Sequence, residues 1–415
     1  MNRQTFVIVG ASLAGASAAA ALRKEGFDGR IVLIGEEAQR PYERPELSKK
    51  YLRAEPGTEL AVHDPDFYAE ADIDLMTDLR VEAVDVHRRE VRAGTLRVPF
   101  DRLLLTTGAT PRRLEVPGND LEGVLTLRTM ADSDTIRESA LKAQDIVVVG
   151  GGWIGSEVAA SLRQLDRSVT LVLPADVPLQ RVVGPEVGSV YRDVHLANGV
   201  QIVKGRRVIG LRGRLAVASV ELDDGRTLAA DLVIAGVGAR PRTEVASGAG
   251  LRFDGEMADG GIAVDARLES SVPGVFAAGD VAAAWHPLYG RNIRVEHWDN
   301  AKRQGRAAAG TMLGRTDLYD RIPFFYSDQF DLGMEYTGFA PRWDEVVFRG
   351  EPLSRKFIAF WLLGGKVVAG MNVNTWDVAP SIERLVRAQA TVERDALADP
   401  ARPLDELVPV PVAAA

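Results

Sequence analysis

The sequence predicts an α/β protein in which two similar strand–turn–helix domains are accompanied by a smaller α+β domain. Its 415 residues are too many for one ordinary hydrophobic core and suggest two or three domains. A buried strand, a glycine-rich turn and a helix of small residues occur twice, about one domain length apart. Beyond residue 322 the pattern changes to short strands, a Gly364-Gly365 hairpin and one helix at residues 380–389.

Composition restricts the class of protein. With 46% hydrophobic and 26% charged residues, the chain is typical of a globular protein. No apolar run reaches the ~20 residues that cross a bilayer, and the start shows no signal pattern, so we expect a cytoplasmic protein without membrane contact. A net charge of −8 and the lack of a basic block disfavour nucleic acid. The absence of cysteine excludes thiolate metal sites and electron relay through a dithiol, and we predict no metal site.

The first repeat runs from a strand at residues 5–9 into the turn Gly10-x-Ser12-x-x-Gly15 and a small-residue helix. Small residues at such a turn let the backbone approach a pyrophosphate at the helix N-terminus. Glu36, after the next strand, is placed to accept hydrogen bonds from a ribose. Because serine replaces the middle glycine, a turn that only packs strand against helix is the alternative.

The second repeat has a strand at residues 145–149 and all three glycines, Gly150, Gly152 and Gly155, followed by a strand at residues 168–173. Two such units imply two bound dinucleotides. A redox enzyme would use them as a permanently held flavin and an exchangeable nicotinamide.

Further strands end in small or acidic residues. Residues 101–109 end in Thr107-Gly108, and residues 231–241 contain Gly238. A third strand ends in Gly279-Asp280, which puts a carboxylate at the edge of a parallel sheet where ligands bind. Alternatively, Asp280 could cap a helix at residues 281–285.

These motifs resemble those of the glutathione-reductase-type flavoproteins. Residues 41–49, 294–301 and 326–331 narrow the resemblance to the FAD-dependent ferredoxin and rubredoxin reductases of bacterial oxygenase systems, up to about residue 390. The resemblance implies two Rossmann-like dinucleotide-binding domains plus a C-terminal α+β domain. We expect an FAD-binding domain at residues 1–110 and 242–321, an NAD(P)-binding domain at 111–241, a reductase domain at 322–405 and a flexible tail at 406–415.

The resemblance also assigns FAD contacts. Four turn residues would hold the pyrophosphate, Glu36 the ribose, Val81 the adenine and Asp280 the ribityl chain. Lys49 would favour the anionic reduced ring, and Trp298 would approach it. Without the resemblance, Lys49 would be taken for a solvated lysine and Trp298 for a packing residue in a loop. The full expected FAD set is Gly10, Ser12, Ala14, Gly15, Glu36, Arg44, Lys49, Val81, Thr107, Gly108, Arg128, Asp280 and Trp298.

For the nicotinamide nucleotide the resemblance assigns Gly150, Gly152, Ile154, Gly155, Glu157 and Gly238, with Glu157 near the nicotinamide. Two departures from the family pattern stand out. Leu173 occupies the place of the acid that selects NADH, so that Asp176 would have to substitute. Arg181 lies too far along the chain to be assigned to a 2′-phosphate, so that NADH is the nucleotide that we expect in preference to NADPH. Glu46 replaces a proline, which we expect to change a turn, or the flavin potential if its charge points inward.

The implied function is hydride transfer from NAD(P)H to FAD and then single-electron transfer to a two-iron ferredoxin that serves a monooxygenase or a ring-hydroxylating dioxygenase. The catalytic candidates are Lys49, Glu157 and Trp298, which would position or tune the transfer. Alternatives are a diaphorase or oxidase that uses a quinone or oxygen, and a redox signalling protein of the apoptosis-inducing-factor type. The protein would be a monomer or a homodimer.

An acidic ferredoxin would need a basic docking patch near the flavin edge. We expect some of five arginines to form it, with ordinary solvated charges as the alternative. The five are Arg303, Arg306, Arg342, Arg349 and Arg355.

Overall fold

The computed structural model describes residues 3–255 and 260–408. Most of the tail predicted at residues 406–415 therefore lies outside the described residues. The chain forms two compact units. The first contains Met1–Arg44, Glu59–Thr110 and Ala239–Arg321, and the second contains Pro45–Thr58, Pro111–Gly238 and Ile322–Ala415.

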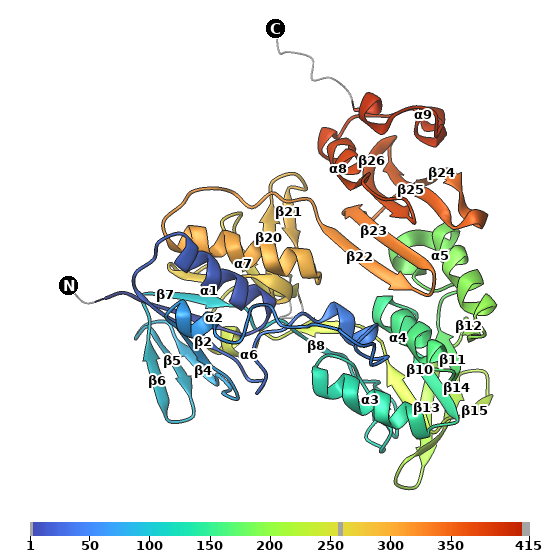
Figure 1. Ribbon diagram of the computed structural model, residues 1–415, viewed down its shortest axis with the longest axis horizontal. Helices are drawn as coiled ribbons and strands as arrows, with labels where there is room; N and C mark the ends of the chain where they lie inside the picture. Colours follow the sequence, from blue (N-terminus) through green and yellow to red (C-terminus); the bar gives the residue numbers. More distant parts are fainter. Residues whose placement is uncertain (1–2, 256–259, 409–415) are drawn as a thin grey trace. The chain divides into compact units, whose positions relative to one another are not determined.

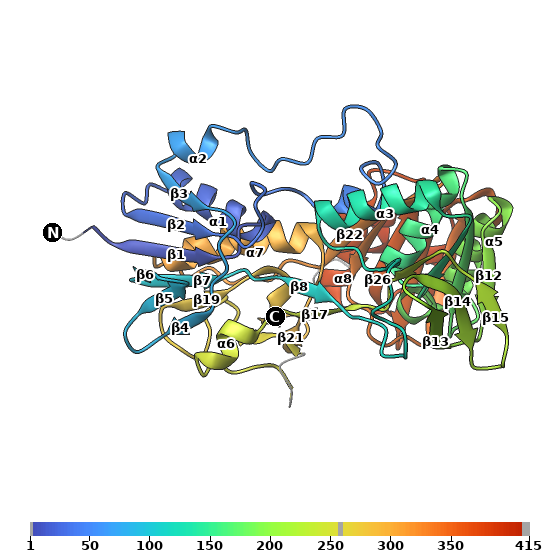
Figure 2. The ribbon, with the colours of Figure 1, turned by 90° about the horizontal axis from the view of Figure 1, so that it is seen from below.

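A five-stranded parallel sheet forms the centre of the first unit, in the order β19-β7-β1-β2-β3. Figure 2 shows β1, β2 and β3 side by side. The strands are β1 (Thr5–Val9), β2 (Arg30–Ile34), β3 (Ile73–Met76), β7 (Arg102–Leu105) and β19 (Val275–Ala277). Apart from the edge strand β3, in which Asp74 is exposed, these strands are mostly apolar and buried on both faces, which is the pattern that parallel sheets require.

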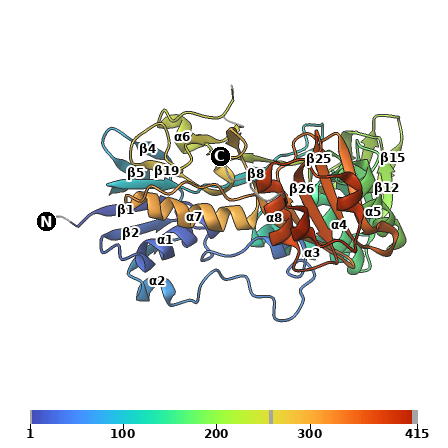
Figure 3. The ribbon, with the colours of Figure 1, turned by 90° about the horizontal axis from the view of Figure 1, so that it is seen from above.

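Helix α1 (Leu13–Lys24) packs against α7 (Trp298–Met312), as Figure 3 shows. Small residues allow the close approach, because a Cβ added to Gly305 would lie 2.2 Å from the carbonyl oxygen of Ala14. The remaining elements of this unit are α2 (Phe67–Glu70), β4 (Ala83–Asp85), β5 (Glu90–Ala93), β6 (Leu96–Pro99), α6 (Glu244–Gly248), β18 (Ile262–Val264), η3 (Gly279–Val281), β20 (Ala282–His286) and β21 (Arg291–Ile293). Strands β8 (Ala109–Pro111) and β17 (Ala239–Pro241) pair where the chain passes between the units.

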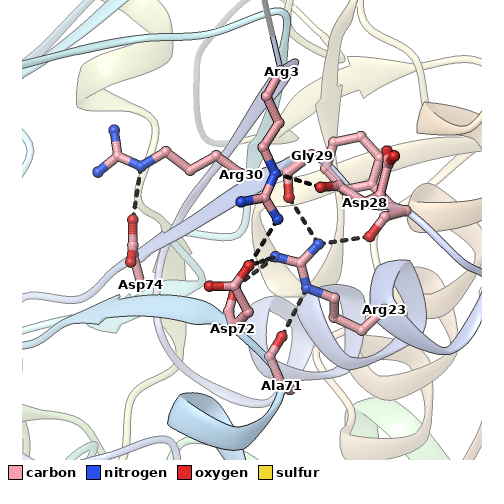
Figure 4. A network of polar contacts seen from close by, with 9 residues as sticks. Arg3, Arg23, Asp28, Gly29, Arg30, Ala71, Asp72 and Asp74 are labelled. Atoms are coloured by element: carbon pink, nitrogen blue, oxygen red, sulfur yellow. Dashed lines mark hydrogen bonds and ion pairs between the residues drawn. The ribbon is translucent and has the colours of Figure 1, made fainter.

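An arginine network closes the amino-terminal edge of the first sheet (Figure 4). Arg23, in the last turn of α1, donates to the carbonyl oxygens of Gly29 at 2.8 Å and Ala71 at 2.7 Å. Arg3 pairs with Asp72 at 2.7 Å. In parallel sheets ligands bind at the opposite, carboxyl edge. This network therefore holds the fold together away from that edge.

Part of the second unit repeats the architecture, with a parallel sheet in the order β12-β11-β10-β16-β9. Figure 1 labels its strands β10, β11 and β12. Its strands are β9 (Val124–Leu125), β10 (Asp145–Val149), β11 (Ser168–Leu173), β12 (Gln201–Lys204) and β16 (Leu232–Ala235). Its other elements are η1 (Pro45–Ser48), α3 (Met130–Lys142), α4 (Trp153–Gln164), α5 (Gln180–Ala197), β13 (Val208–Gly213), β14 (Val217–Leu222) and β15 (Thr227–Ala229). Gly184, at φ +80°, breaks α5 just before Pro185.

The carboxyl-terminal part is an antiparallel sheet in the order β22-β23-β26-β25-β24, with α8 against β26. Its elements are β22 (Phe324–Gln329), β23 (Leu332–Gly338), β24 (Glu345–Glu351), η4 (Pro352–Ser354), β25 (Lys356–Leu363), β26 (Lys366–Val373), α8 (Ala379–Ala388), α9 (Arg394–Ala398) and η5 (Leu404–Leu407). The hairpin at Gly364-Gly365 is confirmed, and both glycines have positive φ. The other face of the sheet buries aromatic residues against α5, in the same core as Tyr191 and Trp361.

The fold class is confirmed as α/β with an α+β carboxyl-terminal part. One local alternative was wrong, because the residues after Asp280 form a strand and no helix. A single 3₁₀ turn follows β19, and β20 then pairs with β18 and β21. Sheet pairing here outweighs the helix propensity of three alanines.

Candidate functional site

The first glycine-rich turn has the geometry of an anion cradle. Gly10 has φ +116°, and a Cβ there would lie 2.2 Å from the carbonyl oxygen of Thr106. Ser12 caps α1 with extended backbone but, among the described residues, makes no side-chain capping hydrogen bond. The first turn of α1 contains no acidic residue. The leading amides, including that of Ala14, are therefore available to a phosphate, which fits the pyrophosphate of FAD.

Glu36 lies where the ribose contact was expected, but it is already paired. Arg242 forms an ion pair with one carboxylate oxygen, and Arg80 lies 3.3 Å from the other. Arg242 is itself held by the strand end, because Thr107 donates its hydroxyl to the Arg242 carbonyl oxygen at 2.6 Å. The Gly108 carbonyl oxygen accepts from the Arg242 amide at 2.9 Å. A ribose would share the Glu36 carboxylate with these arginines.

Arg44, Asp280 and His297 are electrostatically coupled in the first unit. Although burial lowers it, the pKa of Arg44 is raised overall by Tyr42, Glu37 and Asp280. Burial lowers the pKa of His297 to about 4, against an opposing effect of Asp280. The imidazole is therefore neutral at physiological pH. This cluster gives the carboxyl edge of the first sheet a cation and a carboxylate that a flavin tail could bind.

Trp298 is the first residue of α7 and is partly buried, so the expectation of a loop tryptophan was wrong. The Lys302 ammonium lies 4.4 Å from its ring centroid. Val81 is buried in the segment between β3 and β4. Of the expected FAD residues, Lys49 and Arg128 belong to the second unit.

The second glycine-rich turn repeats the geometry of the first. Gly150 has φ +107°, and a Cβ on Gly155 would lie 2.0 Å from the Gly150 carbonyl oxygen. A Cβ on Gly152, the N-cap of α4, would meet no atom within 4 Å among the described residues. Ile154, in the first turn, is 46% exposed, and Gly238 at φ +102° follows β16. The open space at Gly152, before the N-terminus of α4 and close to the exposed side chain of Ile154, has the character of a dinucleotide-binding turn.

Lys49 and Glu157 form a buried ion pair in the second unit. The ammonium lies 2.8 Å from Oε2 of the carboxylate, and each side chain is 5% exposed. Two serine hydroxyls also donate to the carboxylate, Ser48 to Oε2 and Ser327 to Oε1 at 2.6 Å. Lys49 donates in addition to the carbonyl oxygen of Pro45 at 3.0 Å. The pair joins two residues 108 positions apart, and three donors from Lys49, Ser48 and Ser327 converge on one side chain.

Glu46, the residue that departs from the family pattern, lies in the short 3₁₀ helix η1 and is half-buried. Among the described residues its Oε2 atom has no hydrogen-bond partner. Burial raises the pKa of the nearby Asp328, and Glu46 and Glu157 raise it further while Lys49 lowers it. Glu46 therefore acts electrostatically on Asp328, a carboxyl that Lys49 and Glu157 also influence.

Leu173 is 1% exposed at the end of β11. The amide of Arg206 donates to its carbonyl oxygen at 3.1 Å, while the Arg206 guanidinium pairs with Asp224 at 2.7 Å. Asp176 is exposed three residues further on.

One arginine of the expected docking patch was assigned wrongly. Arg349 is 8% exposed and donates to the carbonyl oxygens of Leu397, Pro400 and Arg402. These hydrogen bonds hold the end of α9 and the segment after it against β24. Arg303 pairs with Asp299, and Arg355 with Asp331. Arg306 and Arg342 are exposed.

Sequence reasoning missed most partners of the site residues. It did not identify Ser48, Ser327, Thr106 or the arginines on Glu36, since each pairing is distant in sequence. The motif at residues 326–331 was recognised, and the alternation of buried and open positions along β22 could have pointed to Ser327.

Two glycine-rich turns, each between a parallel strand and a helix, together with a third α+β part, define a two-dinucleotide oxidoreductase. The chain belongs to the pyridine nucleotide-disulphide oxidoreductase family, which matches residues 4–305, and a reductase C-terminal domain matches residues 324–408. It is therefore an FAD-dependent oxidoreductase that uses a pyridine nucleotide, as expected from the sequence. Among the described residues, no helix is long and apolar enough to cross a membrane.

Similar proteins match over nearly the whole chain. Putidaredoxin reductase of Pseudomonas putida is 35% identical over 410 residues, covering 97% of this chain and 96% of that protein. The ferredoxin–NAD(+) reductase component of the anthranilate 1,2-dioxygenase system of Burkholderia cepacia is 36% identical over 406 residues, covering 96% and 98%. The crystal structure of a covalent putidaredoxin reductase–putidaredoxin complex matches with a TM-score of 0.91 at 35% identity, covering 98% of each chain.

Proposed function

We propose that this chain is a ferredoxin reductase that takes electrons from NAD(P)H and delivers them singly to a two-iron ferredoxin of a bacterial oxygenase system. The supporting observation is full-length similarity to reductases named for this activity, in a chain without cysteine. Disulfide-reducing relatives pass electrons through a thiolate. Because no thiol exists here, an external acceptor has to receive them.

The test is NADH-driven reduction of a purified two-iron ferredoxin by the holoenzyme, with a quinone and air as parallel acceptors. Ferredoxin reduction that clearly exceeds both other rates supports the proposal. Equal or faster turnover with quinone or oxygen would instead identify a diaphorase or oxidase. A very slow hydride step with a change of oligomer on adding NADH would identify a signalling protein.

For FAD, we propose that the amides around Gly10, Ser12, Ala14 and Gly15 bind the pyrophosphate. Bound FAD supplies the ability to accept a hydride and to release single electrons. Other contacts would come from Glu36, Arg44, Val81, Thr107, Gly108, Arg128 and Asp280, with Lys49 and Trp298 toward the ring. The uncompensated amides of α1 and the coupled Arg44 and Asp280 support this assignment.

For the nucleotide, we propose that Gly150, Gly152, Ile154, Gly155 and Gly238 receive the pyrophosphate and that Glu157 binds near the nicotinamide. Glu157 contributes by orienting the nucleotide, because a carboxylate oxygen that pairs with Lys49 through its neighbour can accept an N–H. The Lys49 ammonium would place positive charge where the reduced ring becomes anionic. These residues position and stabilise, and no general acid is needed.

We propose NADH as the preferred nucleotide. A 2′-phosphate at the end of β11 would need an available cation, whereas the Arg206 guanidinium pairs with Asp224. Asp176 is the acid that could replace the missing one at Leu173. Asp176→Asn should weaken NADH binding and leave NADPH binding unchanged. Equal kcat/KM for both nucleotides in the unmodified enzyme would contradict the preference.

We propose that Arg306 and Arg342 contribute to ferredoxin docking, with Arg303 and Arg355 as weaker contributors because an acid neutralises each. Arg306→Glu and Arg342→Glu should raise KM for ferredoxin and reduce its salt dependence. Arg214→Glu, an equal charge change at an exposed turn, is the control. The proposal also retains a cytoplasmic location, which cell fractionation would test.

A further inference from the structure

A chain of buried polar side chains runs from α5 to Glu157. His195, in the last turn of α5, lies with Nε2 2.9 Å from Oε1 of Gln329. Gln329 lies with Nε2 3.3 Å from Oγ of Ser327, which lies 2.6 Å from Oε1 of Glu157. His195, Gln329 and Ser327 are each no more than 2% exposed. Such a chain in a hydrophobic core is costly unless every member is satisfied.

Which group donates and which accepts at each hydrogen bond of this series follows from its end at Glu157. Glu157 forms an ion pair with Lys49, and Ser327 donates its single hydroxyl hydrogen to Oε1 of this carboxylate. Ser327 can then only accept from Gln329, which must turn its NH₂ group toward the serine. The Gln329 oxygen therefore faces His195 and requires the Nε2–H tautomer.

Two further observations agree with a neutral Nε2–H imidazole. The Nδ1 atom of His195 is buried and, within the described part of the chain, has no hydrogen-bond partner. A proton on it would be an unpaired buried donor. Burial lowers the pKa of His195, and the hydrogen bond to Gln329 opposes this effect only in part. The rings of Phe330 and His195 pack edge to face, with their centroids 5.2 Å apart.

We propose that His195, Gln329 and Ser327 are positioning residues, a one-way series of donors that fixes Glu157 in one rotamer for the nicotinamide nucleotide. The proposal rests on the proposed role of Glu157. Its Oε2 atom already accepts from Lys49 and Ser48, whereas Oε1 accepts only from Ser327 among the described residues. Since a carboxylate oxygen offers about two acceptor sites, Oε1 is the atom that can accept an N–H of the nucleotide's carboxamide.

The main test is Ser327→Ala in the holoenzyme. Loss of a hydrogen bond to a buried charged group should raise the Kd for NADH about tenfold, since Lys49 and Ser48 still hold the other oxygen. NADH-driven flavin reduction should slow, while ferredoxin reduction by photochemically reduced enzyme should keep its rate. The matched control is Ser156→Ala, which removes a buried hydroxyl next to Glu157 that has no partner among the described residues.

His195 gives a readout that does not depend on activity. The ¹⁵N NMR spectrum of histidine-labelled enzyme, assigned with His195→Gln, should show the Nε2–H tautomer from pH 6 to 8. His195→Gln retains a donor for Gln329 and should bind NADH nearly normally, whereas His195→Leu should weaken binding. An Nδ1–H tautomer or a protonated ring would overturn the proposal.

The outcomes separate this proposal from the proposed function. If Glu157→Gln weakens NADH binding but Ser327→Ala changes it less than twofold, or no more than Ser156→Ala does, the donor series is wrong while the role of Glu157 survives. If Glu157→Gln leaves NADH binding unchanged, the assigned role of Glu157 fails and this proposal fails with it.

Discussion

The Lys49–Glu157 pair should show strong energetic coupling in a double-mutant cycle of Lys49→Met and Glu157→Gln. Both side chains are 5% exposed and their charged atoms lie 2.8 Å apart. Removing one partner of such a pair leaves an uncompensated buried charge, which costs about 3–5 kcal/mol. Lys49→Met should fall near about 3 kcal/mol, because Ser48 and Ser327 still donate to Glu157.

Glu157→Gln should cost at least as much, because the buried Lys49 ammonium would lose its anionic partner and keep only neutral carbonyl oxygens, such as that of Pro45, as acceptors. The double variant buries no uncompensated charge and should lose only about 3 kcal/mol in total. The sum of the single changes exceeds this by about 3 kcal/mol, which is the expected coupling free energy.

The assay is urea unfolding at saturating FAD, followed by tryptophan fluorescence, to which the buried Trp361 of the second unit contributes. The exposed pair Arg394–Glu345, at 2.6 Å with side chains 61% and 42% exposed, is the control. Its coupling should stay below about 1 kcal/mol. Additive free energies for Lys49 and Glu157, or a coupling no larger than the control, would refute the reasoning.

Three further predictions concern the turns, a histidine and an arginine. Gly152→Ala should leave unfolding unchanged yet raise the Kd for NADH, while Gly155→Ala should destabilise the fold because its Cβ meets a carbonyl oxygen at 2.0 Å; unfolding curves and nucleotide titration distinguish them. The His297 pKa of about 4, against 6.5 when exposed, means that its contribution is complete above pH 6.5 and lost as the pH falls toward 4, up to about 3 kcal/mol. Apoprotein unfolding at pH 4–7 should show this slope, and His297→Asn should flatten it. Arg349→Ala should lower Tm without changing KM for ferredoxin, since the guanidinium binds backbone carbonyls; a changed KM with an unchanged Tm would contradict this role.

Local signals made most of the fold predictable. Apolar strands, glycine-rich turns and the Gly364-Gly365 hairpin are set by residues close together in sequence. The strand at residues 282–286 was ambiguous because its partners, at residues 262–264 and 291–293, decide between helix and sheet. Sequence alone supplies no such partner information.

The candidate site was predictable only as single residues. The resemblance pointed to Glu157, but its partners Ser48 and Lys49 come from the end of η1 and the residue after it, and Ser327 comes from β22. Arg349 shows the reverse error. An arginine on a predicted strand suggests a surface charge, whereas packing of the segment after α9 buries it against three carbonyl oxygens. Burial of a charged side chain depends on tertiary packing, which residue type does not reveal.

The geometry of the two turns also explains why the first turn could be recognised although Ser12 replaces its middle glycine. At the first position the backbone has φ above +100°, and at the third a Cβ would lie 2.0–2.1 Å from a carbonyl oxygen of the same turn, in both copies. Those two positions therefore require glycine for steric reasons within the protein. At the middle position Gly152 has φ −79° and Ser12 has φ −116°, both ordinary values for any residue. The middle position is therefore not limited by steric contact within the turn, and a serine there is small enough to leave the space that the proposed pyrophosphate would occupy.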